Sequence, residues 1–176
     1  MARITAYPRD QEDGMPTLGE LADAVRVRVV NDDEALLLGA LHKQALLRGG
    51  TDPDPDRPRH VRAFASAWHP RASDLPAWVA EHDGEHVGMA LVRRTMLPHL
   101  PGAAPRLLVL SALGPATGAS EEAVCLALVR QVVGWARQRG ADRVEVADDV
   151  TLPAPVLDAV RASVRQVRSV SLPTQP

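Results

Sequence analysis

Residues 74–93 read DLPAWVAEHDGEHVGMALVR and contain the clearest structural pattern in the chain. Two mainly apolar runs, 78–81 and 86–92, lie on either side of the dipeptide Asp83-Gly84. Asp-Gly between apolar runs is a strong signal for the short turn that joins antiparallel strands. The stretch therefore predicts a β-hairpin with strands over 78–81 and 86–92.

The chain on both sides of this hairpin alternates between strand and helix patterns. Alternating or continuous apolar residues predict four further strands: 25–30, 106–113, 143–146 and 167–172. The run 106–113 is almost wholly apolar, which is typical of a strand buried on both faces. Apolar residues at helical spacing predict four helices: 35–48, 59–68, 120–139 and 156–165.

The order of these elements, β-α-α-β-β-β-α-β-α-β, indicates an α/β domain with an open, mixed (α+β) central sheet and helices on both faces. The helix 120–139 lies between two strands, which predicts a crossover that makes those strands parallel. We expect one domain over 25–172, an extension or arm over 1–24 and a tail over 173–176. Residues 1–20 are polar and hold two glycines and two prolines, so we expect them to be loosely structured.

Composition excludes several classes of function. The 176 residues are 45% apolar with a formal net charge of −2 and only short runs of like charge, so we expect no nucleic-acid partner. We find no apolar stretch long enough to cross a membrane and no signal peptide, so we expect a cytoplasmic protein without a membrane partner. Cys125 is the only cysteine, which excludes an internal disulfide, and we expect it to be a small core residue.

Three segments of the chain resemble the GCN5-related N-acetyltransferase (GNAT) family. Residues 25–36, VRVRVVNDDEAL, resemble the opening strand of that family and its run into a helix. Residues 74–93 closely resemble the hairpin of its second and third strands, written VAE-x-DG-x-x-VG. Residues 135–146, WARQRGADRVEV, resemble the end of its central helix and the strand that follows. The element order also matches over about 25–172.

This resemblance implies an N-acyltransferase that moves an acyl group from acetyl-CoA, or a related acyl-CoA, to an amine of a small molecule or peptide by direct attack. In the family the acyl-CoA binds where the fourth and fifth strands part, with its pyrophosphate on backbone N–H groups at the start of the central helix. Carried over to this chain, the co-substrate would contact a set of positions on the fourth strand and before the central helix: Leu110, Ala112, Leu113, Thr117, Gly118, Ala119 and Ser120.

The phosphate-binding motif of the family, Arg/Gln-x-x-Gly-x-Gly/Ala, is poorly matched. The aligned residues 120–125 read SEEAVC, so that Ser120 takes the place of the basic residue and other side chains replace the glycines. Two interpretations follow. Either Glu121 and Glu122 stabilise the start of a purely structural helix, or a working acyl-CoA site uses the backbone of 114–120.

The catalytic groups implied by the resemblance are also only partly present. A base must take the proton of the amine, and the fourth strand holds no carboxylate, so the candidates are Asp148 and Asp149 after the fifth strand. The alternative for these two is an acidic turn that caps the next helix. Many family members use a Tyr to assist the departing thiolate, but Tyr7 is the only tyrosine here, which leaves Ser163 or a water. The alternative function is a catalytically silent GNAT-fold binding or interaction module.

Other polar residues of the hairpin are expected to be structural. His82 and His86 flank the Asp-Gly turn, so we expect them to be exposed rather than to bind a metal, and we expect Glu81 and Glu85 to be exposed as well. Family members usually end in a two-stranded hairpin, whereas only a short segment follows the last predicted helix here. A missing strand leaves an open sheet edge that a second subunit could cover, so we expect a homodimer.

Overall fold

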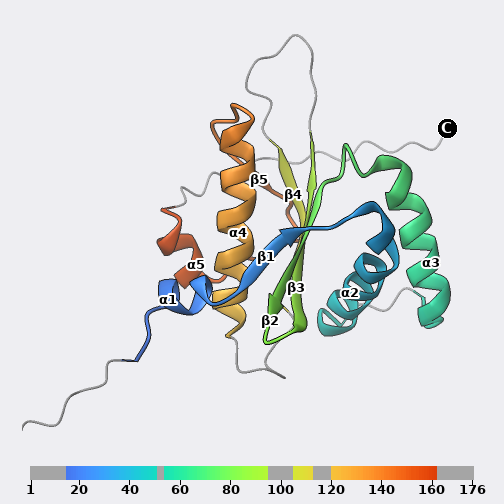
Figure 1. The fold of residues 1–176 in the computed structure, drawn as a ribbon, viewed down its shortest axis with the longest axis horizontal. Coiled ribbons are helices and arrows are strands. Elements are labelled where there is room, and N and C mark those ends of the chain that lie inside the picture. The colour runs from blue at the N-terminus through green and yellow to red at the C-terminus, as the bar shows by residue number, and fades with distance from the viewer. Residues whose placement is uncertain (1–14, 51–53, 95–104, 113–119, 162–176) are drawn as a thin grey trace, which may run out of the picture.

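The structure is a computed structural model that describes residues 15–50, 54–94, 105–112 and 120–161. A five-stranded sheet forms the middle layer (Figure 1). Its strands lie side by side in chain order: β1 (Arg26–Val29), β2 (Ala77–His82), β3 (Glu85–Arg93), β4 (Arg106–Ala112) and β5 (Glu145–Val146). The pairs β1–β2, β2–β3 and β3–β4 are antiparallel, whereas the pair β4–β5 is parallel. The α/β class, the mixed sheet and the hairpin are confirmed, whereas the predicted strand 167–172 lies outside the described residues.

Helices cover both faces of the sheet, as predicted (Figure 1). The two faces carry different sets: α2 (Ala35–Arg48) and α3 (Arg57–Trp68) on one, and α1 (Leu18–Asp23), α4 (Glu121–Gln138) and α5 (Ala154–Ala159) on the other. Two short 3-10 helices, η1 (Asp32–Glu34) and η2 (His69–Arg71), precede α2 and follow α3. The prediction of a last helix over 156–165 is wrong at its end. Arg161 has a φ of 52°, a left-handed conformation that cannot continue a right-handed helix.

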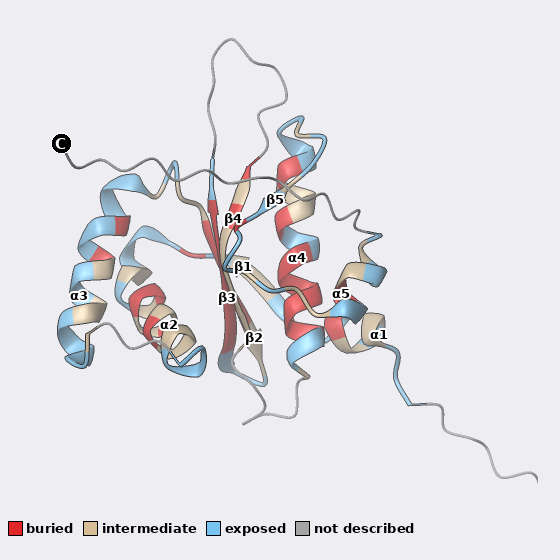
Figure 2. Cartoon of the chain, turned by 180° about the vertical axis from the view of Figure 1, so that it is seen from behind, coloured by how far each residue is buried: buried red, intermediate tan, exposed pale blue. Residues whose placement is uncertain are grey.

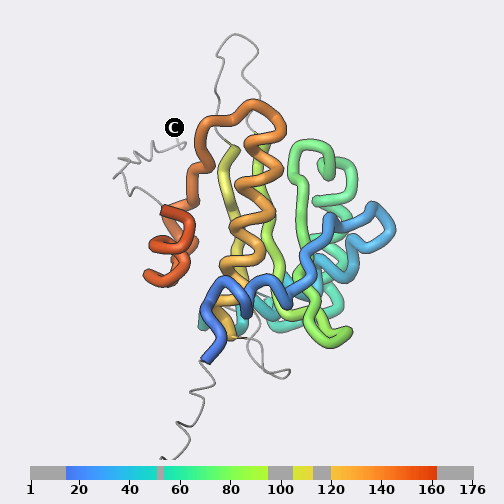
Figure 3. Tube along the Cα trace, turned by 60° about the vertical axis from the view of Figure 1, so that its left-hand side comes forward, coloured from blue at the N-terminus to red at the C-terminus, as the bar shows by residue number. Residues whose placement is uncertain are grey.

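Part of the expected N-terminal extension is helical. α1 begins inside the segment 1–20, so the expectation of loose structure is wrong for the last three residues of that segment. Thr17 and Glu20 form a capping box, in which the N–H of Thr17 donates to the Glu20 carboxylate at 2.7 Å. Asp23 then pairs with Arg130 of α4 at 3.0 Å. This ion pair links α1 to α4, and Figure 3 shows the two helices side by side.

Successive strand residues contribute to two separate hydrophobic cores. Trp78 of β2 is buried in a core between the sheet and α4, and its neighbour Val79 is buried in a second core beneath α2 and α3. This division follows from the alternation of side chains across a strand. Figure 2 shows that the buried residues of α4 lie on the face toward the sheet. Cys125 belongs to the first core, as predicted.

Two glycines let the layers approach closely. A Cβ on Gly88 of β3 would lie 2.7 Å from the carbonyl oxygen of Ser111 and 2.7 Å from Cγ1 of Val124 on α4. A Cβ on Gly39 of α2 would lie 2.7 Å from the carbonyl oxygen of Val61 on α3. Such contacts are too short for any side chain, so the packing of both helices on their partners depends on glycine.

β4 is less buried than its apolar sequence predicts. Leu107 is buried, but the other residues of the strand are only half-buried. The prediction of a strand buried on both faces is therefore wrong, because β5 covers only the beginning of β4. The uncovered remainder of β4 is where the candidate site lies.

Candidate functional site

β4 and β5 part after a short parallel pairing. Only Arg106 and Leu107 of β4 have partners on β5, and the last backbone hydrogen bond runs from the N–H of Ala147 to the carbonyl of Leu107 at 2.9 Å. β4 continues through 108–112, and no strand in the described part of the chain lies along that edge. Among the described residues, the parting therefore leaves backbone N–H and C=O groups of β4 without a strand partner on this side, as at the edge of a sheet.

A β-bulge in β4 lies at the point where the two strands separate. On β3, Leu91 pairs with Val109 and Val92 pairs with Leu107, so Leu108 is an extra residue of β4. A bulge bends its strand and increases the local twist. The bulge thus gives a local reason for the parting, and the uniform apolar run of this strand carried no signal for it.

The first turn of α4 follows β4 along the chain. Ser120 is the N-cap residue, and its Oγ accepts a hydrogen bond from the N–H of Ala123 at 3.1 Å. Glu121 and Glu122 form the first turn. The start of this 18-residue helix presents free N–H groups and the positive end of the helix dipole, a favourable place for an anion.

Arg48, the last residue of α2, joins the end of β4 to the start of α4. Its Nη1 donates to the carbonyl of Ala112, and its Nη2 lies 2.8 Å from Oε1 of Glu121. A cation from the helical layer on one face of the sheet thus reaches the first turn of the helix on the other face. Sequence reasoning missed Arg48, because it is 73 positions from Glu121 in the sequence and lies in no recognisable motif.

Asp148 and Asp149 come directly after the last backbone bond between β4 and β5, so they lie where the strands part. Both are exposed, and Oδ2 of Asp148 is 3.6 Å from Nη2 of Arg106. The alternative of an acidic turn is right in part: the N–H of Val150 donates to the carbonyl of Ala147 at 3.0 Å, so the two residues form a turn. They do not cap the next helix, because the N-cap residue of α5 is Pro153 and no side chain caps that helix. Their proposed role as a base stays a prediction.

The other predicted contacts of the co-substrate are only partly described. Leu110 and Ala112 are half-buried and pack against the core beneath α4. Five predicted residues lie outside the described residues: Leu113, Thr117, Gly118, Ala119 and Ser163. The roles of these five stay predictions.

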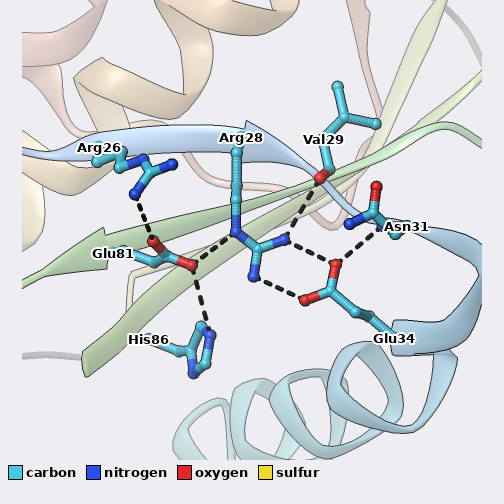
Figure 4. A network of polar contacts seen from close by, with 7 residues as sticks. All are labelled: Arg26, Arg28, Val29, Asn31, Glu34, Glu81 and His86. Atoms are coloured by element: carbon cyan, nitrogen blue, oxygen red, sulfur yellow. Dashed lines mark hydrogen bonds and ion pairs between the residues drawn. The ribbon is translucent and has the colours of Figure 1, made fainter. Parts of the chain in front are cut away.

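A polar network lies at the β1 edge of the sheet, opposite the β5 edge, and Figure 4 shows its side chains. Nε of Arg28 donates to Oε1 of Glu81 at 2.7 Å, and its two Nη atoms donate to the two oxygens of Glu34 at 2.7 Å. Glu81 also lies 3.9 Å from Arg26 and 3.6 Å from His86. The expectation that Glu81 is exposed is wrong: 19% of its side chain is exposed, because three basic side chains surround it.

The Glu34 carboxyl of this network is a poor candidate for a catalytic base. The hydrogen bonds from Arg28, followed by one from the N–H of Asn31, lower the pKa of the Glu34 carboxyl to about 2. A carboxyl with so low a pKa is a poor proton acceptor at neutral pH. The alternating arginines of β1 hinted at a charged row on one face of this strand, but nothing in the sequence identified the acidic partners.

Two histidines, His42 and His60, form a pair between α2 and α3 that sequence reasoning did not identify. Nδ1 of His42 on α2 lies 3.1 Å from Nε2 of His60 on α3, and both rings stack with Phe64. Burial, and then the nearby His60, lower the pKa of His42 to about 4, so this ring is neutral at pH 7.

At the hairpin, His86 and Glu85 are exposed, as predicted. His82 is half-buried, so the expectation that it is exposed is wrong.

Within the described ranges, no group of three or more histidine, cysteine or acidic side chains is placed to hold a metal ion. None of the helices in the same ranges is long and apolar enough to cross a membrane.

The fold has close counterparts among solved structures, although no protein-family model and no curated protein matches the sequence. A probable acetyltransferase is 17% identical, with a TM-score of 0.67 over 86% of this chain and 99% of that one. A predicted acetyltransferase from Clostridium acetobutylicum, solved with acetyl-CoA, is 16% identical, with a TM-score of 0.62 over 85% of this chain and 96% of that one.

A GCN5-related N-acetyltransferase from Ralstonia eutropha JMP134 is 17% identical, with a TM-score of 0.61 over 85% of this chain and 97% of that one. At such low identities the likeness establishes the architecture rather than the activity. The protein has the fold of the GCN5-related N-acetyltransferases.

Proposed function

We propose that the protein is an N-acyltransferase of the GNAT family, which binds acetyl-CoA or a related acyl-CoA at the open edge of β4. The observation that carries this proposal is the parting of β4 from β5 beside the first turn of α4. The solved structure of similar fold that contains acetyl-CoA supports the choice of co-substrate.

The donors and acceptors along this edge fit the chemistry of an acyl-CoA. Its pantetheine arm is extended and contains amides, so it can pair with the backbone of 108–111, which has no strand partner on this side among the described residues, as an added strand does. Its pyrophosphate would lie toward the first turn of α4, where the helix dipole favours an anion. Arg48 brings a cation to this turn and offsets the charge of Glu121. It thereby compensates in part for the basic residue that the phosphate-binding motif lacks here.

The proposed reaction is a direct transfer. The neutral amine of a small-molecule or peptide acceptor attacks the thioester carbon, a C–N bond forms, and the C–S bond breaks to release the CoA thiolate. The amine gives its proton to Asp148 or Asp149, and the thiolate receives one from Ser163 or a water. Cys125 is unsuited to form a covalent intermediate, because burial, and then the nearby Glu121 and Glu122, raise the pKa of its thiol to about 11.

Binding of acetyl-CoA tests the proposal most simply. A ligand that binds only the native state raises its apparent stability by mass action, so the melting temperature should rise with acetyl-CoA concentration, and calorimetry should give one site per chain. No binding at millimolar acetyl-CoA would overturn the proposal and favour the silent binding module.

Turnover, measured as thiol release with a panel of amines, tests the base. We expect Asp148→Asn or Asp149→Asn to lower kcat by roughly 100-fold or more, because a general base contributes about that much. Asp142→Asn is the matched control. Asp142 is an exposed aspartate that pairs with Arg143 at 3.3 Å, and it precedes β5, whereas Asp148 and Asp149 follow that strand. Full activity in both test variants would exclude these two residues as the base.

A further inference from the structure

We infer that Arg48 is a positioning residue of the proposed co-substrate site, which neutralises Glu121 and fixes the start of α4 against the end of β4. This inference rests on the proposed function, because it concerns how the anionic end of an acyl-CoA can approach a helix that begins with two glutamates. Arg48 lies outside the segment that aligns with the family's phosphate-binding motif, whereas its partner Glu121 lies within that segment.

The geometry gives Arg48 two simultaneous contacts. One Nη donates to the carbonyl of Ala112, the last residue of β4, and the other lies 2.8 Å from Glu121, the first residue of α4. A planar guanidinium holds two such acceptors in a fixed relation, which a single ammonium cannot do. Arg48 thus sets the position of the Glu121 carboxylate relative to the open edge of β4.

The charges at this turn explain why that position matters. Glu121 and Glu122 both stand in the first turn of α4, and Glu122 forms no ion pair with the part of the chain that the structure describes. Without Arg48, two uncompensated carboxylates would repel a pyrophosphate at this helix end. With Arg48 in place, one of the two is neutralised and held by its partner.

The pair is too exposed to act mainly on folding. The side chains of Arg48 and Glu121 are 44% and 53% exposed, and ion pairs in such positions contribute little to stability. A substitution at Arg48 should therefore change the affinity for an anionic ligand and leave the melting temperature nearly unchanged. This separates a positioning role from a structural one.

The chain offers a matched control in Arg130. Its side chain is 45% exposed and pairs with Asp23 at 3.0 Å, so it resembles Arg48 in exposure and in pairing. Its partner belongs to α1, away from the end of β4. Arg130→Gln removes an equivalent ion pair from α4 without changing the charge at the first turn.

The experiment measures the affinity of acetyl-CoA by calorimetry for wild type, Arg48→Gln, Arg48→Lys, Glu121→Gln, the double variant Arg48→Gln/Glu121→Gln, and Arg130→Gln. We expect Arg48→Gln to weaken binding by about threefold to tenfold, the effect of one charge at a partly exposed helix end. Arg48→Lys keeps the positive charge but cannot hold both acceptors at once, so its affinity should lie between those of wild type and Arg48→Gln. The double variant should bind like wild type, and Arg130→Gln should have no effect.

A second probe, S-acetyl pantetheine, lacks the pyrophosphate, so its binding should not respond to Arg48→Gln. The loss for acetyl-CoA should also shrink at high salt, because screening weakens interactions between exposed charges. Equal affinities of wild type and Arg48→Gln, a double variant as weak as Arg48→Gln, or an equal loss for S-acetyl pantetheine would each overturn the inference. A wild-type protein that binds no acetyl-CoA would instead overturn the proposed function itself.

Discussion

The two ends of the sheet differ in how completely their strands are paired. β1 pairs with β2 over its whole length, and the Arg28 network ties both strands to η1. β5 pairs with β4 over two residues only, and the charged groups beside it are exposed. The polar contacts able to stabilise the fold therefore lie at the β1 edge of the sheet, which we call the closed end. At the β5 edge, the open end, backbone groups of β4 and exposed charged side chains are available to a ligand.

The ion pairs at the two ends illustrate this contrast. At the closed end, Arg28 is 26% exposed and makes three hydrogen bonds of 2.7 Å with two carboxylates. At the open end, Arg106 is 41% exposed and lies 3.6 Å from Asp148, which is 65% exposed. Charge-assisted, partly buried hydrogen bonds are much stronger than such exposed pairs.

The largest expected effect comes from Gly88, where β3, β4 and α4 meet. Gly88→Ala should lower the free energy of unfolding by about 1–3 kcal/mol or more, because its Cβ would overlap atoms of Ser111 and Val124. Gly134→Ala is the control: Gly134 lies inside α4 with open space around it, so alanine should raise that free energy by up to about 1 kcal/mol. Urea unfolding measures both, and equal effects of the two substitutions would contradict the packing described.

The second prediction compares the two arginines directly. Arg28→Gln should lower the free energy of unfolding by about 1–2 kcal/mol, because it leaves Glu34 and Glu81 half-buried with weaker partners. Arg106→Gln should change it by less than about 0.5 kcal/mol, since its ion pair is exposed. The same unfolding measurements apply, and a larger effect at Arg106 would reverse the comparison of the two ends.

The third prediction is that the stability of the protein falls in acid over two separate pH ranges, an upper and a lower window. The pKa of Glu34 falls from 4.5 to about 2 on folding, so its contribution to stability is complete above pH 4.5 and is lost as the pH falls toward 2. The pKa of His42 falls from 6.5 to about 4, so the unfolded state takes up this proton first and stability also declines as the pH falls from 6.5 to 4.

Thermal unfolding between pH 2 and 8 separates these contributions. Glu34→Gln should flatten the lower window and leave the upper one, and His42→Gln should do the reverse. Unchanged pH profiles in both variants would show that neither group is responsible.

Sequence reasoning predicted the parts of the fold that depend on local pattern. The hairpin, the helices over 35–48 and 120–139 and the parallel crossover follow from alternation, helical spacing and turn residues, which act over a few positions. α1 was missed because its capping box stands in a short segment rich in glycine and proline, whose weak helical signal is reinforced only by packing on α4. The bulge at Leu108 was missed because an apolar run gives no sign of its register.

The candidate site could be located but not completed from the sequence. Ser120 precedes α4, and Asp148 and Asp149 follow β5, as the element order predicted, but their roles in a site stay predictions. Arg48, by contrast, meets Glu121 only in the folded chain, and Glu81 is enclosed by residues from other strands. Pairings between distant segments depend on tertiary structure, and one sequence does not encode them in any local pattern.

Amide chemical shifts measured during a titration with acetyl-CoA would show whether an acyl-CoA binds at the open edge of β4. We predict saturable shifts at Leu110, Ala112 and the first turn of α4, while the amides of Arg28 and Glu81 at the closed end stay unchanged. No shifts at millimolar acetyl-CoA, or shifts that are largest around Arg28 and Glu81, would contradict the claim.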